Sequence, residues 1–238
     1  MNETCVPYVR TSVDMQTYGR ALALAWHEAL GTWPTKSQAG VLYAQYGVET
    51  GGPPKAACWC WNLGNVKHVA GDGYDYYMLP NTSERINGKL QYFQPPSPIT
   101  WFRAYGSLDV AMHDHFAFLR GKYKRCWQGV ELEDVGLFAR LLKEGPDGKE
   151  NTADDYYTAT SEAYAAGMRR HFNAWMASDA FESAMASVDA MNDRPTEPII
   201  EAAEPANDTT PLVEPGSIIH PDLPPWPRSD DEPPDDAA

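Results

Sequence analysis

Residues 35–51 carry the strongest folding signal in the chain, because both ends of a helix are marked there. Thr35 is followed three residues later by Gln38, which is a capping-box pattern, and Gly51 is typical of a helix end. Apolar residues recur between them at helical spacing, at Ala39, Leu42, Tyr43 and Tyr46. The pattern predicts a helix over residues 36–50 with a buried face that other elements must cover.

Three further helices are predicted around it. Ser12 or Asp14 can cap a helix that ends at Gly31, with apolar residues Leu22, Ala25, Trp26 and Ala29 on one face. Ser107 can cap another, whose buried side carries Leu108, Ala111, Met112, Phe116 and Leu119. A later helix has Tyr164, Met168, Phe172 and Trp175 at helical spacing, which we interpret as packing residues.

The helical period disappears between Val66 and Tyr105. Asn87-Gly88 favours a two-residue hairpin turn, because both residues tolerate the positive φ angles of a type I′ turn. Glu84 therefore falls on a predicted strand of that hairpin. We expect a mainly α (α+β) fold, with a helical domain and a small β-hairpin lobe.

Composition divides the chain at residue 193. The last 46 positions hold eleven prolines, twelve acidic and two basic residues, so they account for −10 of the net charge of −14. We therefore expect one folded domain over residues 1–192 and a disordered acidic, proline-rich tail over 193–238. The tail is interpreted as either a solubilising extension or a docking segment. Neither part has a basic stripe, so nucleic acid is not an expected partner.

The sequence predicts neither a membrane span nor a metal or cofactor site. No stretch reaches membrane-spanning length, and the amino terminus lacks the pattern of a secretory signal. The four cysteines, at 5, 58, 60 and 126, lack zinc-site spacing; we expect reduced thiols, with a disulfide from Cys58 or Cys60 to Cys126 as the alternative. The histidines His68, His113 and His115 are interpreted as core or surface residues.

Glu49 is the first candidate catalytic residue. It lies seven residues after Leu42 and so points along the buried stripe of its helix. Burial disfavours the charged form of a carboxyl, raises its pKa and lets it act as a general acid near neutral pH. The alternative is an ordinary glutamate at a helix end that the following glycines cap.

Glu84 is the second candidate, because a strand can hold it across a groove from the helix of Glu49. Glycoside hydrolysis uses two such carboxyls: one protonates the leaving oxygen, and the other activates water or stabilises the transition state. Glu84 could equally be a solvated strand residue. Aromatic residues that sugar rings could stack on cluster nearby in sequence, at Trp59, Trp61, Tyr74, Tyr76 and Tyr77, and we expect two or three of them to line the groove.

Five short motifs follow one another along the chain. They are Glu49-Thr50-Gly51-Gly52, Trp61-Asn62-Leu63-Gly64-Asn65-Val66-Lys67, Thr82-Ser83-Glu84, Phe102-Arg103-Ala104-Tyr105-Gly106-Ser107 and Tyr156-Tyr157-Thr158-Ala159. Their order and spacing resemble the bacterial and phage endo-β-N-acetylglucosaminidase family, relatives of the flagellar peptidoglycan hydrolase domain in the lysozyme superfamily. The resemblance covers roughly residues 14–176.

The resemblance implies a lysozyme-like fold and cleavage of the N-acetylglucosaminyl-β-1,4-N-acetylmuramic acid bond of peptidoglycan. It places Glu49 as proton donor, Glu84 as second acidic residue, and Tyr156 as the cleft tyrosine, with a register that Tyr157 leaves open by one position. An acetamido group of the substrate is the alternative to Glu84 in assisting the reaction. Possible sugar contacts fall at Asn62, Lys67, Trp61 and Tyr157.

Two features depart from the family pattern or qualify its function. Gly52-Pro53-Pro54 replaces the family's usual aromatic residue after Glu-x-Gly.

A wall hydrolase without a secretory signal, made in the cytoplasm, needs another route to the periplasm or cell wall. We therefore expect delivery by a phage virion or injection machinery. Tail or apparatus proteins would then be the partners of residues 193–238. The alternatives are a muramidase or lytic transglycosylase, and a structural or wall-binding protein without turnover.

Overall fold

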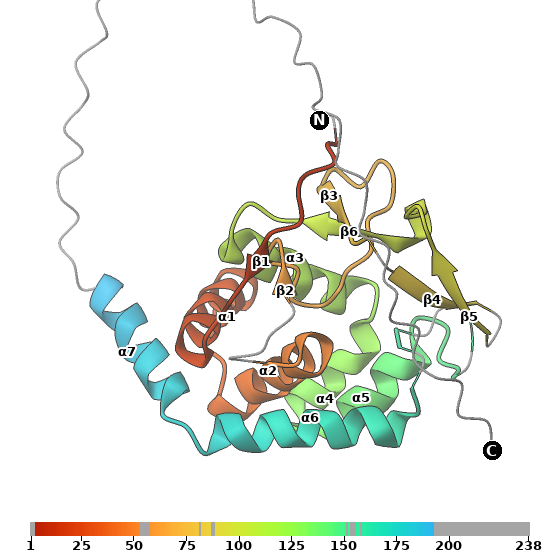
Figure 1. Cartoon of the computed structure of the whole chain (residues 1–238). Helices are drawn as coiled ribbons and strands as arrows, with labels where there is room; N and C mark the ends of the chain where they lie inside the picture. The colour runs from red at the N-terminus through yellow and green to blue at the C-terminus, as the bar shows by residue number, and fades with distance from the viewer. Residues whose placement is uncertain are drawn as a thin grey trace, which may run out of the picture. The chain divides into compact units, whose positions relative to one another are not determined.

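The computed structural model describes residues 3–52, 58–80, 82–86, 89–150, 152, 156–157 and 159–192, without the side chains of 83–86, 90, 191 and 192. Helices dominate this part of the chain (Figure 1). They are α1 (Met15–Leu30), α2 (Lys36–Thr50), α3 (Leu108–Gly121), α4 (Trp127–Glu131), α5 (Val135–Glu144), α6 (Ser161–Met176) and α7 (Ala180–Asn192), with 3-10 turns at Pro98–Thr100 and Lys124–Cys126. The predicted mainly α class with a small β part is confirmed.

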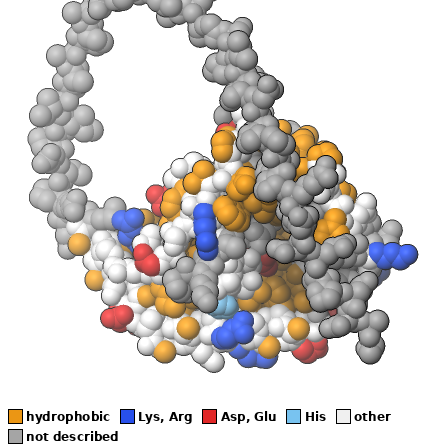
Figure 2. Space-filling view, viewed as in Figure 1, with side chains coloured by type: hydrophobic (Ala, Val, Ile, Leu, Met, Phe, Trp, Pro, Cys, Tyr) orange, Lys and Arg blue, Asp and Glu red, His pale blue; other side chains and the backbone are white. Residues whose placement is uncertain are grey.

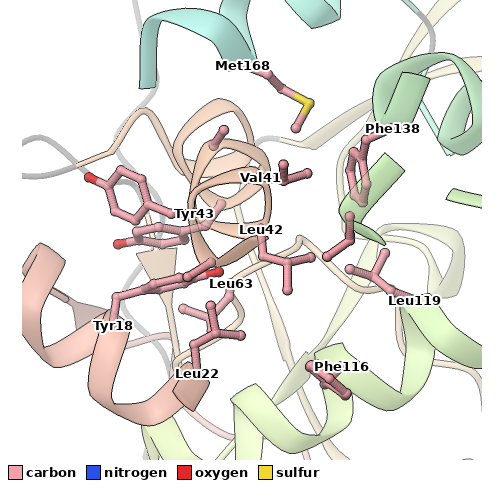
Figure 3. Packing of buried hydrophobic residues seen from close by; sticks show 14 of the residues in the cluster. Tyr18, Leu22, Val41, Leu42, Tyr43, Leu63, Phe116, Leu119, Phe138 and Met168 are labelled. Atoms are coloured by element: carbon pink, nitrogen blue, oxygen red, sulfur yellow. The ribbon is translucent and has the colours of Figure 1, made fainter. Parts of the chain in front are cut away.

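Helix α2 is the centre of the fold. Every residue from Ala39 to Gly47 is buried, and a helix that is apolar all round has to be surrounded by other elements. Helices α1, α4, α5 and α6 pack against it. Figure 3 shows Val41 between Met168 of α6 and Phe138 of α5, with Leu42 and Tyr43 facing Tyr18 and Leu22 of α1.

The predicted helix boundaries are confirmed where capping residues marked them. The side chain of Thr35 accepts a hydrogen bond from the N–H of Gln38, and Oε1 of Gln38 accepts one from the N–H of Thr35. Asp14 caps α1, and Ser107 caps α3. Each cap satisfies an N–H that would otherwise lack a partner in the first turn.

In the described residues the β part consists of three two-stranded antiparallel sheets. Strand β1 (Arg10–Thr11) pairs with β2 (Cys58–Trp59), β3 (Asp75–Met78) with β6 (Trp101–Ala104), and β4 (Thr82–Ile86) with β5 (Lys89–Phe93). Ile86 pairs with Lys89, so the predicted hairpin is confirmed. Its turn residues Asn87 and Gly88 lie outside the described residues.

Three other expectations concern the thiols, the membrane and the tail. All four cysteines are unpaired, as expected, and the alternative disulfide is absent. Within the described residues no helix combines the length and hydrophobicity that a membrane span needs. The predicted domain of residues 1–192 ends where α7 ends, and the predicted tail, 193–238, lies outside the described residues.

Candidate active site

Glu49 lies in the last turn of α2, where the chain leaves the core. Gly51 and Gly52 follow it with φ angles of 84° and 66°, a region that side chains with a Cβ rarely adopt. A Cβ on Gly52 would also lie 3.0 Å from the ring of His171. The two glycines therefore let the chain turn sharply away at the end of a buried helix, and Glu49 as a whole residue is only partly buried.

Two side chains hold the Glu49 carboxyl group. The hydroxyl of Tyr164, in the first turn of α6, donates a hydrogen bond of 2.6 Å to Oε1. The amide of Asn65 donates to Oε2 at 3.3 Å and to the backbone carbonyl of Glu49 at 2.8 Å. The carboxyl group thus has a fixed orientation, because its donors come from a helix and from a loop that packs on α2.

The environment raises the pKa of Glu49 above its ordinary value. Burial is the dominant cause, since it disfavours the charged carboxylate, and the hydrogen bonds from Tyr164 and Asn65 act in the opposite direction. The side chain is nevertheless not closed off from solvent. A carboxyl group with these properties can hold a proton at higher pH than a solvated glutamate and can still reach a ligand.

The loop before Lys67 places Asn65 against α2. Asn65 has φ of 51°, and asparagine tolerates this left-handed conformation better than most residues. Asn62 is fully buried: its amide donates to the carbonyls of Val66 and Arg103, and its Oδ1 accepts from the N–H of Val66. The buried Asn62 side chain therefore serves to hold the loop, and its sugar contact stays a prediction.

Tyr156 and Tyr157 take different positions. The Tyr156 hydroxyl donates to the carbonyl of Gly64 at 2.7 Å and accepts from Nε2 of Gln45 at 3.0 Å. Burial, and then the charge of Glu49, raises the Tyr156 pKa well above its ordinary value. Tyr156 is thus the tyrosine of this pair that packs on the loop of Asn65, beside Glu49.

Tyr157 packs against the ring of Tyr164 instead. Their rings stack with centroids 3.8 Å apart and planes 4° from parallel. The Tyr157 hydroxyl donates to the carbonyl of Ala139 in α5 at 2.7 Å. Tyr157 therefore supports the ring of Tyr164, while its predicted sugar contact stays a prediction.

A buried pair lies beneath the loop. Nε2 of His115, in α3, is 2.7 Å from Oε1 of Gln45, in α2. Burial lowers the pKa of His115 to about 4, so its ring is neutral at neutral pH. The pair extends the contacts of Tyr156 into the core: a Cβ on Gly64 would lie 2.4 Å from the His115 ring and 3.0 Å from the Tyr156 hydroxyl oxygen. Only glycine permits this close approach.

The other expected sugar contacts are placed but not tested. Lys67 is half-buried with Nζ 3.9 Å from the centroid of the Phe102 ring, and Trp61 packs partly buried against the main core. Tyr77 is buried beside Phe102 in a second small core, and Tyr76 stacks on Trp101, so these two tyrosines serve packing. The positions of Lys67 and Trp61 leave a sugar contact a prediction.

Glu84 is placed only by its backbone. It lies on β4 opposite Gln91 of β5, and its side chain is outside the description. Whether its carboxyl group faces Glu49 stays a prediction.

Figure 2 shows hydrophobic side chains gathered around a hollow between the region of the strands and that of α2 and α6. A separate pocket, of about 470 Å³, is lined by residues such as Arg125, Trp127 and Leu141 and contains none of the site residues.

Comparison with known proteins gives distant structural likenesses only. No family model matches the sequence, and no curated protein matches it. The fold is similar to a C-terminally truncated glycoside hydrolase domain from Salmonella typhimurium FlgJ, with a TM-score of 0.44, 19% identity and coverage of 69% of this chain and 99% of that one. It is also similar to the catalytic domain of the autolysin Auto from Listeria monocytogenes, with a TM-score of 0.42, 15% identity and coverage of 74% and 90%. The function is therefore inferred from the chain's own residues.

Sequence reasoning missed Tyr164 and Asn65, which donate hydrogen bonds to the Glu49 carboxyl group. The helical spacing of Tyr164 predicts packing, which is correct for its buried ring but overlooks its hydroxyl. Met168 and Trp175 of the same helix are fully buried, as predicted. A tyrosine in the first turn of a helix, close to the end that meets the site, could have signalled a polar role. Asn65 lies within the quoted loop motif, and its tolerance of a positive φ was the available signal.

Proposed function

We propose that the chain hydrolyses β-1,4 glycosidic bonds in the glycan strands of peptidoglycan, as an endo-β-N-acetylglucosaminidase with Glu49 as its general acid. The observation that carries this proposal is the Glu49 carboxyl group itself, desolvated at the end of the central helix and oriented by Tyr164 and Asn65. The order of the five sequence motifs supports the choice of substrate.

The proposed chemistry begins with a protonated Glu49. Tyr164 donates to Oε1 at 2.6 Å, whereas Oε2 has only the longer contact to Asn65, at 3.3 Å. Oε2 is therefore the oxygen that we assign to carry the proton and to give it to the glycosidic oxygen as the bond breaks. The carboxylate left behind keeps both hydrogen-bond donors, which stabilise the charge as it develops. Water then completes the hydrolysis.

Glu84 is proposed as the second carboxyl group, which activates that water or stabilises the positive charge on the sugar. Its position on the β4–β5 hairpin supports this role, because a hairpin beside a helical body can bring a side chain to the edge of a groove. Delivery by phage virion or injection machinery, and docking through residues 193–238, are further proposals that concern a part of the chain outside the described residues.

The deciding experiment is digestion of purified peptidoglycan, with the released fragments reduced by borohydride and their ends read by mass spectrometry. Reduced N-acetylglucosamine ends are expected. Reduced muramic acid or anhydromuramic ends would assign the bond to a muramidase or a lytic transglycosylase instead. A folded chain that releases nothing would overturn the enzymatic proposal in favour of a binding or structural role.

Two matched variants assign the carboxyl groups. Glu49→Gln keeps the shape of the side chain but cannot donate a carboxyl proton, so we expect a loss of about 10²–10⁴-fold in rate with the fold retained. Glu84→Gln should reduce the rate less, because water can still attack without its help. Digestion by Glu49→Gln at the parental rate would show that another residue is the acid.

A further inference from the structure

A second cluster of titratable side chains shares no residue with the site around Glu49. It lies where the N-terminal segment meets the loop that precedes β3. Nε2 of His68 is 3.3 Å from Oε2 of Glu3 and 3.6 Å from Oδ1 of Asp72. The exposed fractions of the three side chains are small, 2% for His68, 17% for Glu3 and 11% for Asp72. Three potential ligand atoms thus converge at a nearly enclosed point.

His68 has no ordinary structural role that explains its position. Neither ring nitrogen makes a hydrogen bond to any part of the chain that the structure describes, although both are buried. The ring packs beside Tyr76, with centroids 4.6 Å apart, and near Trp101. An aromatic hydrocarbon side chain would fill this space at no polar cost, whereas a buried imidazole whose nitrogens make no hydrogen bond destabilises the fold. Nε2 of His68, which faces Glu3 and Asp72, therefore lacks a partner that a bound ligand would supply.

Glu3 is held in place by the backbone. The N–H groups of Gly71 and Gly73 donate to its two oxygens at 3.0 and 2.7 Å. Within the described residues the ion-pair partner of Glu3 is His68, so its Oε2 and the His68 Nε2 face the same point.

Asp72 is also held by hydrogen bonds. The N–H of Val69 and Nε of Arg103 both donate to its Oδ2, at 3.1 and 2.8 Å. Arg103 is shared, since its Nη1 also pairs with Asp114 at 2.8 Å. The other oxygen of Asp72, Oδ1, faces Nε2 of His68.

We propose that Glu3, His68 and Asp72 bind one Zn²⁺ ion. Zinc ligands lie about 2.0–2.2 Å from the metal, so neighbouring ligand atoms of a tetrahedral site are about 3.4 Å apart. The separations of 3.3 and 3.6 Å from Nε2 of His68 match that spacing. Imidazole with two carboxylates suits zinc, whereas calcium and magnesium take oxygen ligands. Water completes the fourth position, which the partial exposure of Glu3 permits.

The backbone around the cluster orients the two carboxylates. Oε2 of Glu3 accepts from the N–H of Gly71, and Oδ1 of Asp72 accepts from the N–H of Tyr74 at 3.1 Å. Each oxygen keeps a second lone pair for the metal, an arrangement typical of carboxylates that ligate metals. The ion would join residue 3 to a loop 65 or more positions away and so restrain the N-terminal segment against β3.

Zinc titration of the purified full chain tests the site. After dialysis against a chelator, isothermal calorimetry with Zn²⁺ should give one site per chain, and zinc should raise the melting temperature. His68→Phe keeps an aromatic ring between Tyr76 and Trp101 but removes the nitrogen. This variant should weaken zinc binding by more than the roughly 10–100-fold that loss of a merely orienting group causes. His113→Phe is the matched control, because His113 also lies 3.3 Å from a glutamate, Glu28, but is 41% exposed; it should bind zinc like the parent.

Three results would overturn the proposal: no zinc binding, zinc binding that His68→Phe leaves unchanged, or equal loss in His113→Phe. Glu3→Gln gives a second ligand variant if His68→Phe does not fold, and it should also lose the zinc-dependent rise in melting temperature. The rival arrangement is a His68 ring that only packs beside Tyr76 and Trp101. It predicts no response to zinc.

Discussion

The hydroxyl of Tyr164 lies 2.6 Å from Oε1 of Glu49 and donates a hydrogen bond to it across 115 residues of sequence. The two residues belong to α6 and α2, which pack closely along their length. Burial makes Glu49 a weaker acid, and Tyr164 partly offsets that effect. Contact between two helices thus contributes to the acidity of Glu49, beside the larger effect of burial.

Removal of the Tyr164 hydroxyl should weaken the proposed acid. In Tyr164→Phe the developing carboxylate loses a hydrogen bond to a charged group, worth about 1.5–3 kcal/mol. We expect peptidoglycan digestion to slow by about tenfold or more and the alkaline limb of the pH–rate profile to move to higher pH. Tyr157→Phe is the control, because its hydroxyl bonds to Ala139 while its ring stacks on Tyr164. Equal pH profiles for the two variants would contradict the role of Tyr164.

Glu49 should make the protein less stable as the pH rises. Its pKa in the folded state is raised above the unfolded value, mainly by burial, so the folded state binds the proton more tightly. The stabilisation is complete below the ordinary pKa of glutamate and is lost as the pH rises through the folded pKa. Glu49→Gln should therefore have a higher melting temperature than the parent at pH 7.5 and a similar one at pH 4. A lower melting temperature at pH 7.5 would contradict this.

His115 should make the protein less stable as the pH falls, which is the opposite of the effect of Glu49. Burial lowers its pKa to about 4 in the folded state, against 6.5 for an ordinary histidine. Below pH 6.5 the unfolded state binds a proton that the folded state does not, so stability falls as the pH drops toward 4, by up to about 3 kcal/mol. His115→Gln should flatten that part of the curve of unfolding free energy against pH. His27→Gln, a change near the end of α1, is the comparison, and the same flattening there would argue against His115.

Two substitutions separate the effect of the Asn65 amide from the effect of its backbone conformation. Asn65→Gly tolerates the φ angle of 51° but loses both hydrogen bonds to Glu49. We expect the glycine variant to fold and to digest peptidoglycan more slowly. Asn65→Ala should be both slow and less stable, because alanine is strained at this φ. If the glycine variant is as active as the parent, the amide does not position Glu49.

Gly64 should not accept a side chain. A Cβ there would meet the His115 ring at 2.4 Å and the Tyr156 hydroxyl oxygen at 3.0 Å, so Gly64→Ala should cost about 1–3 kcal/mol of stability and disturb the site. Gly121→Ala is the control: it lies at the end of α3 with open space around it and should be neutral or slightly stabilising. Chemical denaturation of both variants measures the difference, and similar unfolding free energies would refute the close approach.

The helices were predictable because their signals are local. Thr35, Gln38 and Gly51 fix both ends of α2 within seventeen residues of sequence, and Asn87-Gly88 marks the hairpin between Ile86 and Lys89. Such caps and turns depend on hydrogen bonds between near neighbours, which a sequence displays directly. The burial of Glu49 followed from helical periodicity in the same way.

The contacts of the site were not predictable, because they join distant segments. Nothing in the sequence near Tyr164 shows that its hydroxyl meets Glu49 rather than solvent, and the same spacing fits a residue that only packs. Asn62 shows the same ambiguity. An asparagine in a loop motif fits a sugar contact or a buried backbone clamp, and only its neighbours in space, Val66 and Arg103, distinguish the two.

The far end of α6 is anchored by Trp175, whose Nε1 donates to the carbonyl of Lys36 at 2.9 Å and whose ring stacks on Tyr43. Eleven residues separate Trp175 from Tyr164, three turns of helix or about 16 Å. Because an α-helix is stiff over three turns, a tilt of α6 at Trp175 also displaces Tyr164. The alignment of the proposed acid is therefore sensitive to packing at the opposite end of α6, so a substitution that shifts Trp175 should also move the Tyr164 hydroxyl relative to Glu49.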